Sequence, residues 1–492
     1  MATHLSILQV VLPLVAAPLC VLARRPGLSW LITLIVVWLC LGVAALLLNH
    51  AVHIGPISYE LGGWPPPWGI EYRIDVLNAF VLLLVSAIGA IVLPFARDSV
   101  LEEIGPDRAY LFYASLLLCM TGLLGMAATG DAFNVFVFLE ISSLSSYILI
   151  SMGRDRRALT SAFQYLIMGT IGGTFVLIGI GFMYAATGTL NMADLAERLP
   201  LAGDSRTVRV AYAFFIVGVS LKMALFPLHL WLPNAYAFAP SAVTVFLAAT
   251  ATKVAVYIML RFTFDVFGLN IAFSESPLET LLVLLSAVAV IAASVSAIFQ
   301  ENVKRSFAYS SVAQIGYIML GIALLNITGL TAGILHLFNH ALAKGAIFMA
   351  LGCVFLRTRS IRLPDMAGLG QQMPWTMAAF VVGGLSLIGV PLTVGFISKW
   401  YLIQATLEQG LWPIAVLVLV GSLLAVIYVW RVVETAYLQE PAEGRPRYQE
   451  APLSMLLPTW VMVLANLYFG IHTSLTAGTA QHAAQLLMGI GS

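Results

Sequence analysis

The sequence predicts an all-α polytopic membrane protein with about fourteen transmembrane helices. Two observations carry this prediction. Of the 492 residues, 60% are hydrophobic and only 10% are charged, whereas a soluble domain carries about 25% charged residues. The apolar residues also gather in windows of about 20, which is the length that crosses a hydrocarbon core of about 30 Å. A soluble enzyme is therefore excluded.

Windows of this length define the candidate spans, with boundaries accurate to a few residues. They lie near residues 5–22, 28–48, 74–95, 110–128, 131–152, 160–186, 207–226, 241–260, 277–298, 306–325, 331–356, 375–404, 411–437 and 452–472. The first is expected to be a retained span and not a cleaved signal peptide, because basic residues follow it and none precede it. The longest interruptions, 49–73 and 187–206, are expected to be surface loops with room for a short interfacial helix.

Charge and cysteine usage exclude further classes. The net charge is +1 and no basic stripe is present, which argues against a nucleic-acid binder. The four cysteines, Cys20, Cys40, Cys119 and Cys353, stand far apart with no CxxC spacing. A disulfide framework, a zinc site and an iron–sulfur cluster are therefore not expected, and no metal or bound cofactor is predicted.

Basic residues in the loops predict the orientation. Fifteen lie after odd-numbered spans and five after even-numbered spans. Because cytoplasmic loops are enriched in Lys and Arg, the former loops are expected in the cytoplasm. Both termini should then face the outer side of a cytoplasmic (inner) membrane.

Four lysines and one acid lie well inside predicted spans, away from their ends, at a cost of about 2.5–3.5 kcal/mol each if central and charged. They are Glu140, Lys222, Lys253, Lys344 and Lys399. The remaining lysine, Lys304, and all of the arginines are expected in loops. A buried lysine can release its proton, whereas arginine stays charged in proteins, so this choice of residue favours a proton pathway. The alternative is that each lysine reaches an interface or ties two helices together.

The predicted span 331–356 adds two imidazoles to this set. His336, His340 and Lys344 are spaced at i, i+4 and i+8, which places them on one helix face. Imidazoles can donate and accept protons, so the stripe could pass a proton along the helix. A haem or metal pair and simple packing are the alternatives.

Two predicted spans are interrupted by proline. Pro227 and His229 follow Lys222 closely, and Pro391 lies between two glycines ahead of Lys399. Proline removes a backbone donor and clashes with the preceding turn, so both spans should kink or unwind. Broken helices in matching halves indicate inverted repeats around a transport site. The expected division is three N-terminal helices in 1–109, five-helix repeats in 110–262 and 277–437, and a C-terminal helix and tail in 438–492.

Three sequence runs resemble the antiporter-like subunits of respiratory complex I, and most of all the D-type member of the Mrp multisubunit cation/proton antiporters. They are LKMALFPLHLWLPNAYAFAPSAVTVFLAATATKVAVY, HLFNHALAKGAIF and GVPLTVGFISKW. The resemblance implies fourteen helices, two inverted five-helix repeats and a polar axis at mid-membrane. Some family members have glutamate at the position of Lys399.

Residue roles follow from this resemblance by position. It implies that Glu140 pairs with Lys222, that Lys253 connects the two halves, and that Lys399 faces the output side. His336, His340 and Lys344 match the family's His/Lys stripe, and His229 matches the histidine of its broken segment.

Three functions are compatible with these residues. The first is the proton-translocating subunit of a multisubunit Na+ or K+/proton antiporter, with other membrane subunits as partners. The second is the proton-pumping subunit of a redox complex such as complex I or a membrane-bound hydrogenase, whose redox groups would belong to partners. The third is a structural membrane scaffold, which the buried charges disfavour. The chain itself is expected to be an ion translocator and not an enzyme.

Overall fold

The computed structural model describes residues 2–202, 206–273, 278–441 and 443–490. The first half of the chain contains α1 (Ala2–Ala23), α2 (Pro26–His53), β1 (Ile57–Glu60), η1 (Leu61–Gly63), β2 (Glu71–Ile74), α3 (Val76–Glu103), α4 (Pro106–Ala128), α5 (Ala132–Ser151), α6 (Arg156–Thr187), α7 (Met192–Leu201), α8 (Arg206–Met223), α9 (Trp231–Phe238), α10 (Ser241–Leu260) and the π-helical turn η2 (Arg261–Val266). The second half contains α11 (Gly268–Phe273), α12 (Leu278–Ile298), α13 (Val303–Ala323), α14 (Ile327–Thr358), η3 (Leu363–Met366), α15 (Leu369–Gln372), α16 (Pro374–Ile388), α17 (Val394–Glu408), α18 (Trp412–Leu438), α19 (Leu453–Ile471) and α20 (Ser474–Leu487). The predicted all-α polytopic class is confirmed.

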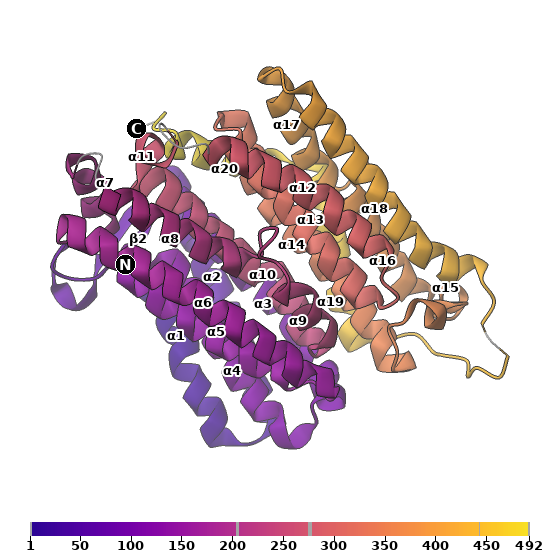
Figure 1. The fold of residues 1–492 in the computed structure, drawn as a ribbon. Coiled ribbons are helices and arrows are strands. Elements are labelled where there is room, and N and C mark those ends of the chain that lie inside the picture. The colour runs from indigo at the N-terminus through magenta and orange to yellow at the C-terminus, as the bar shows by residue number, and fades with distance from the viewer. Residues whose placement is uncertain (1, 203–205, 274–277, 442, 491–492) are drawn as a thin grey trace.

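The long helices lie side by side, with α10 and α14 between the two halves of the chain (Figure 1). In the described residues, twelve helices are long and apolar enough to cross a membrane. The two predicted spans that are not among them are 207–226 and 375–404, the two that were expected to be broken near Pro227 and at Pro391. In the structure, α8 and the short α9 lie on either side of Pro227, and α16 and α17 lie on either side of Pro391.

Helix α14 lies at the centre of the molecule. It packs against α10, α13, α16, α17 and α19, and its middle, from Gly329 to Val354, is buried throughout. By contrast, α1, α2, α6 and α18 expose large apolar side chains, as helices that face lipid do. The stripe of α14 therefore lies away from lipid.

The two breaks have different backbone signatures. After α8, Ala224 adopts φ 59° and the Phe226–Pro227 peptide is cis. After α16, Gly389 ends the helix with φ 91°, a conformation that glycine adopts without strain. Irregular backbone at membrane depth is tolerated where protein or a wet cavity surrounds it.

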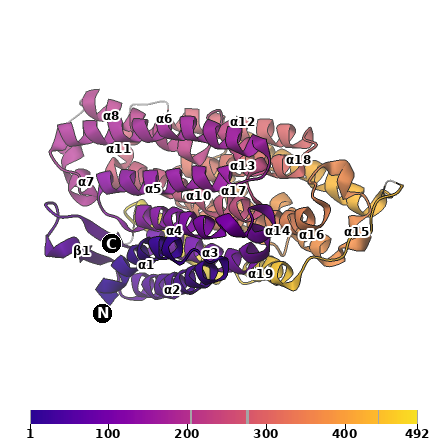
Figure 2. The same ribbon diagram turned by 90° about the horizontal axis from the view of Figure 1, so that it is seen from below.

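Two features at the chain's surface differ from expectation. The segment 49–73 does not form a short helix beyond η1; it contains the antiparallel hairpin β1–β2, in which Ile57 pairs with Ile74. The segment 187–206 contains α7, as expected. The C-terminal tail folds into a further helix, α20. The hairpin and α7 lie at the end of the molecule that also carries both termini, opposite α15 (Figure 2).

Two basic residues expected in loops are inside the protein. Lys304 is only 4% exposed, in the first turn of α13, and its Nζ donates to the Ala239 carbonyl at 3.3 Å and the Ser241 hydroxyl at 3.1 Å. Arg261 continues α10 as part of the span Ser241–Val266. The expectation was wrong because the folded chain supplies partners for both side chains: neutral oxygen atoms accept from Lys304, and the Asp75 and Asp265 carboxylates pair with Arg261.

Candidate functional site

The ionisable residues predicted inside spans come from five helices. Glu140 lies on α5, Lys222 on α8, Lys253 on α10, and Lys399 on α17, while α14 carries the His336, His340 and Lys344 stripe. All except Glu140 are buried. The folded chain therefore holds six of these seven residues away from lipid.

Glu140 and Lys222 form the ion pair that the resemblance implies. The Lys222 Nζ lies 3.4 Å from the Glu140 Oε1 and donates to the Ser143 hydroxyl at 2.7 Å. Gly173 of α6 makes room for the carboxylate, because a Cβ at that position would lie 2.2 Å from the Glu140 Oε1. Lys222 is also in the last turn of α8, where the negative end of the helix dipole favours an ammonium.

A small cavity adjoins this pair. It has a volume of about 30 Å³ and is lined by Lys222 and by Ser142, Ser143 and Ser146 of α5. Apolar side chains, among them Leu123, Met126 and Ile258, form most of the remaining wall, and the volume is large enough for one ordered water beside the polar groups. Such a water would lie between the Lys222 ammonium and the serine hydroxyls of α5.

Lys253 is held by neutral oxygen atoms. It is 1% exposed, and its Nζ donates to the Ala248 carbonyl at 2.5 Å and the Thr252 hydroxyl at 3.3 Å. Within the described part of the chain, no carboxylate forms an ion pair with it. The lysine leans toward the N-terminus of α10, the usual direction of long side chains on helices.

The two histidines of α14 differ in their partners. His336 bonds through Nδ1 to the Ser398 hydroxyl at 2.7 Å and through Nε2 to the Gln314 amide oxygen at 2.9 Å. An amide oxygen only accepts, so Nε2 carries the proton in the neutral ring and Nδ1 accepts from Ser398. Neither His340 nitrogen has a partner among the described residues, and its ring stacks 6.3 Å from that of His336.

Lys344 and Lys399 complete the second half of the site. Lys344 donates to the Phe307 carbonyl at 2.6 Å and to the Ser310 hydroxyl. Lys399 donates to the carbonyls of Leu387 and Ile388, at 2.8 and 3.0 Å. These carbonyls belong to the last turn of α16, so the break supplies acceptors that an intact helix would use itself.

Tyr317 connects Lys399 to the stripe. The Lys399 Nζ lies 4.8 Å from the centre of the Tyr317 ring, and that ring lies 5.8 Å from the His336 ring. Lys399 also donates to the Ser422 hydroxyl at 2.9 Å. His336 and Lys399 are thus close neighbours, separated by one aromatic ring and by Ser398.

The remaining predicted residues lie in the breaks. Pro227 and His229 are between α8 and α9, and Pro391 is between α16 and α17. The His229 ring stacks on Phe226 at 5.1 Å. No hydrogen bond between His229 and the lysines is found in the described residues, so the structure does not bring it into direct contact with them.

Sequence reasoning missed the neutral polar residues of the site. They are Ser143, Ser310, Gln314, Tyr317, Ser398 and Ser422. The signal for three of them was present in α13, where Ser310, Gln314 and Tyr317 recur at helical spacing within an apolar span.

Comparisons with known proteins identify the family to which the chain belongs. Residues 129–425, more than half of the chain, match the protein family described as "NADH:quinone oxidoreductase/Mrp antiporter, TM". The chain is 42% identical over 486 residues to the N-type subunit of the NADH-quinone oxidoreductase of Desulforudis audaxviator, a match that covers 96% of each chain. It is 29% identical over 447 residues to the D-type subunit of the Na(+)/H(+) antiporter of Bacillus subtilis, covering 91% of this chain and 89% of the relative.

Solved structures give the same result in three dimensions. A chain of the Mrp complex from Dietzia sp. superposes with a TM-score of 0.91 at 26% identity, covering 99% of this chain and 97% of that one. The predicted resemblance to antiporter-like subunits is thereby confirmed. The chain belongs to the NADH:quinone oxidoreductase/Mrp antiporter family of membrane subunits.

Proposed function

We propose that this chain is the proton-translocating subunit of a multisubunit monovalent cation/proton antiporter that exchanges Na+ or K+. The observation that carries the proposal is the way the lysines are held. Lys253, Lys344 and Lys399 donate to carbonyl and hydroxyl oxygens, which accept from an ammonium and, more weakly, from a neutral amine. Each lysine can thus lose its proton without leaving an unpaired carboxylate behind.

The Glu140–Lys222 pair is proposed to control the first step. While the pair is intact, the carboxylate stabilises the Lys222 ammonium in a site that is nearly dry. When the pair separates, the ammonium loses its counter-charge and its proton moves toward Lys253. The cavity beside Lys222 provides room for a water on this side of the lysine.

The second half is proposed to carry the proton onward. His336 bonds through Nε2 to Gln314 and through Nδ1 to Ser398, the residue next to Lys399, so once it is protonated at both nitrogens it can release the Nδ1 proton on the Lys399 side. The proton then reaches Lys399 next to the α16–α17 break and leaves. The protonation state of each group changes the electrostatic energy of the next, which couples the steps.

The similar proteins suggest partners and a location. The Mrp structure is a complex, and we propose that this chain likewise works with other membrane subunits in a cytoplasmic membrane. Both termini, which lie at the same end as the hairpin, are proposed to face outward, and the repeats are proposed to be 110–262 and 277–437. The chemistry of the site is ion translocation and not catalysis.

A second candidate function is the proton-pumping subunit of a redox-driven complex. The relative that is 42% identical is named as a subunit of NADH-quinone oxidoreductase, and this observation favours it. Identifying the subunits that co-purify with the chain separates the two. Small antiporter-type membrane partners support the first function, and flavin and iron–sulfur proteins support the second.

Proton movement into vesicles that contain the assembled complex tests the proposal. Lys222→Ala and Glu140→Ala are each expected to abolish translocation while the complex still assembles. Arg157→Ala, which removes an exposed ion pair with Asp155, is the matched control and should leave translocation unchanged. Normal translocation in either Ala variant of the buried pair would reject the proposal.

A further inference from the structure

A large cavity lies at the end of the molecule that carries the termini (Figure 2). Its volume is about 800 Å³, and its walls come from β2, the start of α3, α7, η2 and α20. These elements follow even-numbered predicted spans, which places the cavity on the face that we propose to be outer. None of the residues in the proposed proton pathway lines it.

One face of α10 and η2 runs from the middle of the molecule into this cavity. Lys253, Tyr257, Arg261 and Asp265 recur every four residues, and the last three line the cavity. Tyr257 is buried one turn from Lys253, and its hydroxyl donates to the Ala127 carbonyl at 3.1 Å. The cavity therefore reaches to within one helical turn of the backbone of Lys253, whose amine points toward the opposite end of α10.

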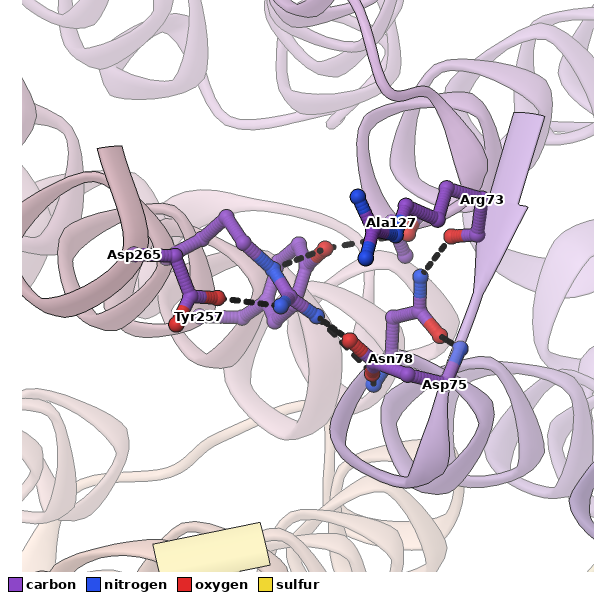
Figure 3. A network of polar contacts seen from close by, with 7 residues as sticks. Arg73, Asp75, Asn78, Ala127, Tyr257 and Asp265 are labelled. Atoms are coloured by element: carbon purple, nitrogen blue, oxygen red, sulfur yellow. Dashed lines mark hydrogen bonds and ion pairs between the residues drawn. The ribbon is translucent and has the colours of Figure 1, made fainter. Parts of the chain in front are cut away.

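Arg261 lies where the cavity meets this face. Its Nη2 is 2.7 Å from the Asp75 Oδ2, its Nη1 pairs with Asp265, and its Nε donates to the Tyr257 hydroxyl at 3.3 Å. Figure 3 shows Asp75 and Asp265 on opposite sides of this network, with Tyr257 between them. The guanidinium is therefore held in one position by two carboxylates from different elements.

Asp75 is itself fixed by the backbone. It precedes α3, accepts from the Asn78 backbone N–H at 3.1 Å, and Asn78 in turn accepts from the Asp75 backbone N–H at 2.7 Å. This reciprocal capping box orients the carboxylate toward η2. Arginine stays charged in proteins, but its two carboxylate partners leave the network with a net negative charge, so it separates the cavity from Lys253 through bonded side chains and not by repelling cations.

From this geometry we infer that the cavity is the outer access vestibule for the transported proton, and that Arg261 is its gate. Held by Asp75 and Asp265, Arg261 and Tyr257 separate the vestibule from Lys253. When the carboxylates release the guanidinium, the path along α10 opens. The inference rests on the proposed function, because it gives the Lys222–Lys253 pathway a connection to one face of the membrane.

A thiol placed in the vestibule tests the first part. The native cysteines are all buried, so a membrane-impermeant, positively charged methanethiosulfonate reagent is directed to an introduced thiol. In the assembled complex, Ala193→Cys on the cavity wall is expected to react and to lose at least half of its proton translocation on labelling. Leu201→Cys lies on the same helix outside the cavity and is 83% exposed; it should react without loss.

The gate is tested by releasing Arg261. Asp75→Asn retains a capping side chain but removes the charge, and with Asp265→Asn it should raise passive proton leak through the complex several-fold. Asp265→Asn alone, which keeps the Asp75 pair and so protects folding, should raise it less. Asp155→Asn is the matched control, because Asp155 also caps a helix and pairs with an arginine, Arg157, at the opposite end.

The outcomes separate the two proposals. If Ala193→Cys fails to react, or reacts without slowing translocation, the vestibule is overturned. If the double variant leaks no more than Asp155→Asn, the gate is overturned. In both cases the dependence of translocation on Lys222 can remain, whereas translocation that persists in Lys222→Ala overturns the proposed function itself.

Discussion

At the residue scale, the site combines one ion pair with several lysines held by neutral oxygens. In the described residues, only Lys222 of the four predicted lysines has a carboxylate within ion-pair distance. A single ion pair that must break and re-form is suited to control a pathway. The paired and the separated states differ strongly in energy, because the surroundings have a low dielectric constant. The remaining lysines are suited to proton transfer, because their carbonyl and hydroxyl partners accept hydrogen bonds from both the charged and the neutral amine.

The space that Gly173 leaves for Glu140 gives a prediction at this scale. Gly173→Ala places a methyl group 2.2 Å from the present position of the Glu140 Oε1, so the carboxylate must leave its present position beside Lys222. We expect translocation to fall at least tenfold, measured as proton uptake by vesicles that contain the assembled complex.

Gly181→Ala on the same helix is the control for this substitution. Nothing lies within 4 Å of a Cβ at Gly181, and alanine stabilises a helix interior relative to glycine by roughly 0.5–1 kcal/mol. Its translocation should equal that of the unaltered chain. Equal rates in Gly173→Ala and Gly181→Ala would contradict a role for the Glu140 position.

The sequence revealed the charged residues of the site but not their neutral neighbours. A lysine inside an apolar span stands out because its insertion is costly. Hydroxyl residues do not, since many of them bond to the carbonyl one turn back in their own helix, as Thr121 does to Leu117. Only the folded chain shows that Ser143 and Ser398 are directed to other helices instead.

At the scale of elements, the break between α16 and α17 positions the carbonyl oxygens that accept hydrogen bonds from Lys399. Proline and glycine predicted both breaks correctly, because their backbone constraints act locally. Arg261 was assigned to a loop because a charged residue ends an apolar window, and its partner Asp75 lies 186 positions away. The hairpin was missed because its strands are only four residues long.

The α16–α17 break gives a second prediction. Gly389 has φ 91°, and a Cβ there would lie 3.0 Å from the Lys399 Cδ. Gly389→Ala should therefore lose about 1–2 kcal/mol of stability from the left-handed backbone and also displace Lys399. We expect a lower thermal unfolding midpoint together with a loss of translocation.

Gly410→Ala separates these two effects. Gly410 has a similar φ of 72°, but nothing lies within 4 Å of its Cβ position. Its unfolding midpoint should fall by a similar amount while translocation is retained. If Gly410→Ala loses translocation to the same extent, backbone strain and not the Lys399 position accounts for the defect.

At the scale of the whole molecule, the account depends on buried amines that change protonation state. Composition and hydropathy were enough to predict the membrane class and the spans, because both follow from the bilayer's thickness and polarity. The contacts between helices needed the folded chain, since they join segments far apart in sequence. The central α14 brings the groups from both halves together.

Lys222→Arg in the assembled complex tests this claim most directly. Arginine keeps the positive charge and can still pair with Glu140, and the adjoining cavity of about 30 Å³ gives room for the larger head group. It cannot release a proton in a protein. Measured as proton uptake by vesicles containing the complex, translocation is predicted to fall to the level of Lys222→Ala with assembly intact. Translocation at the unaltered rate would contradict the account.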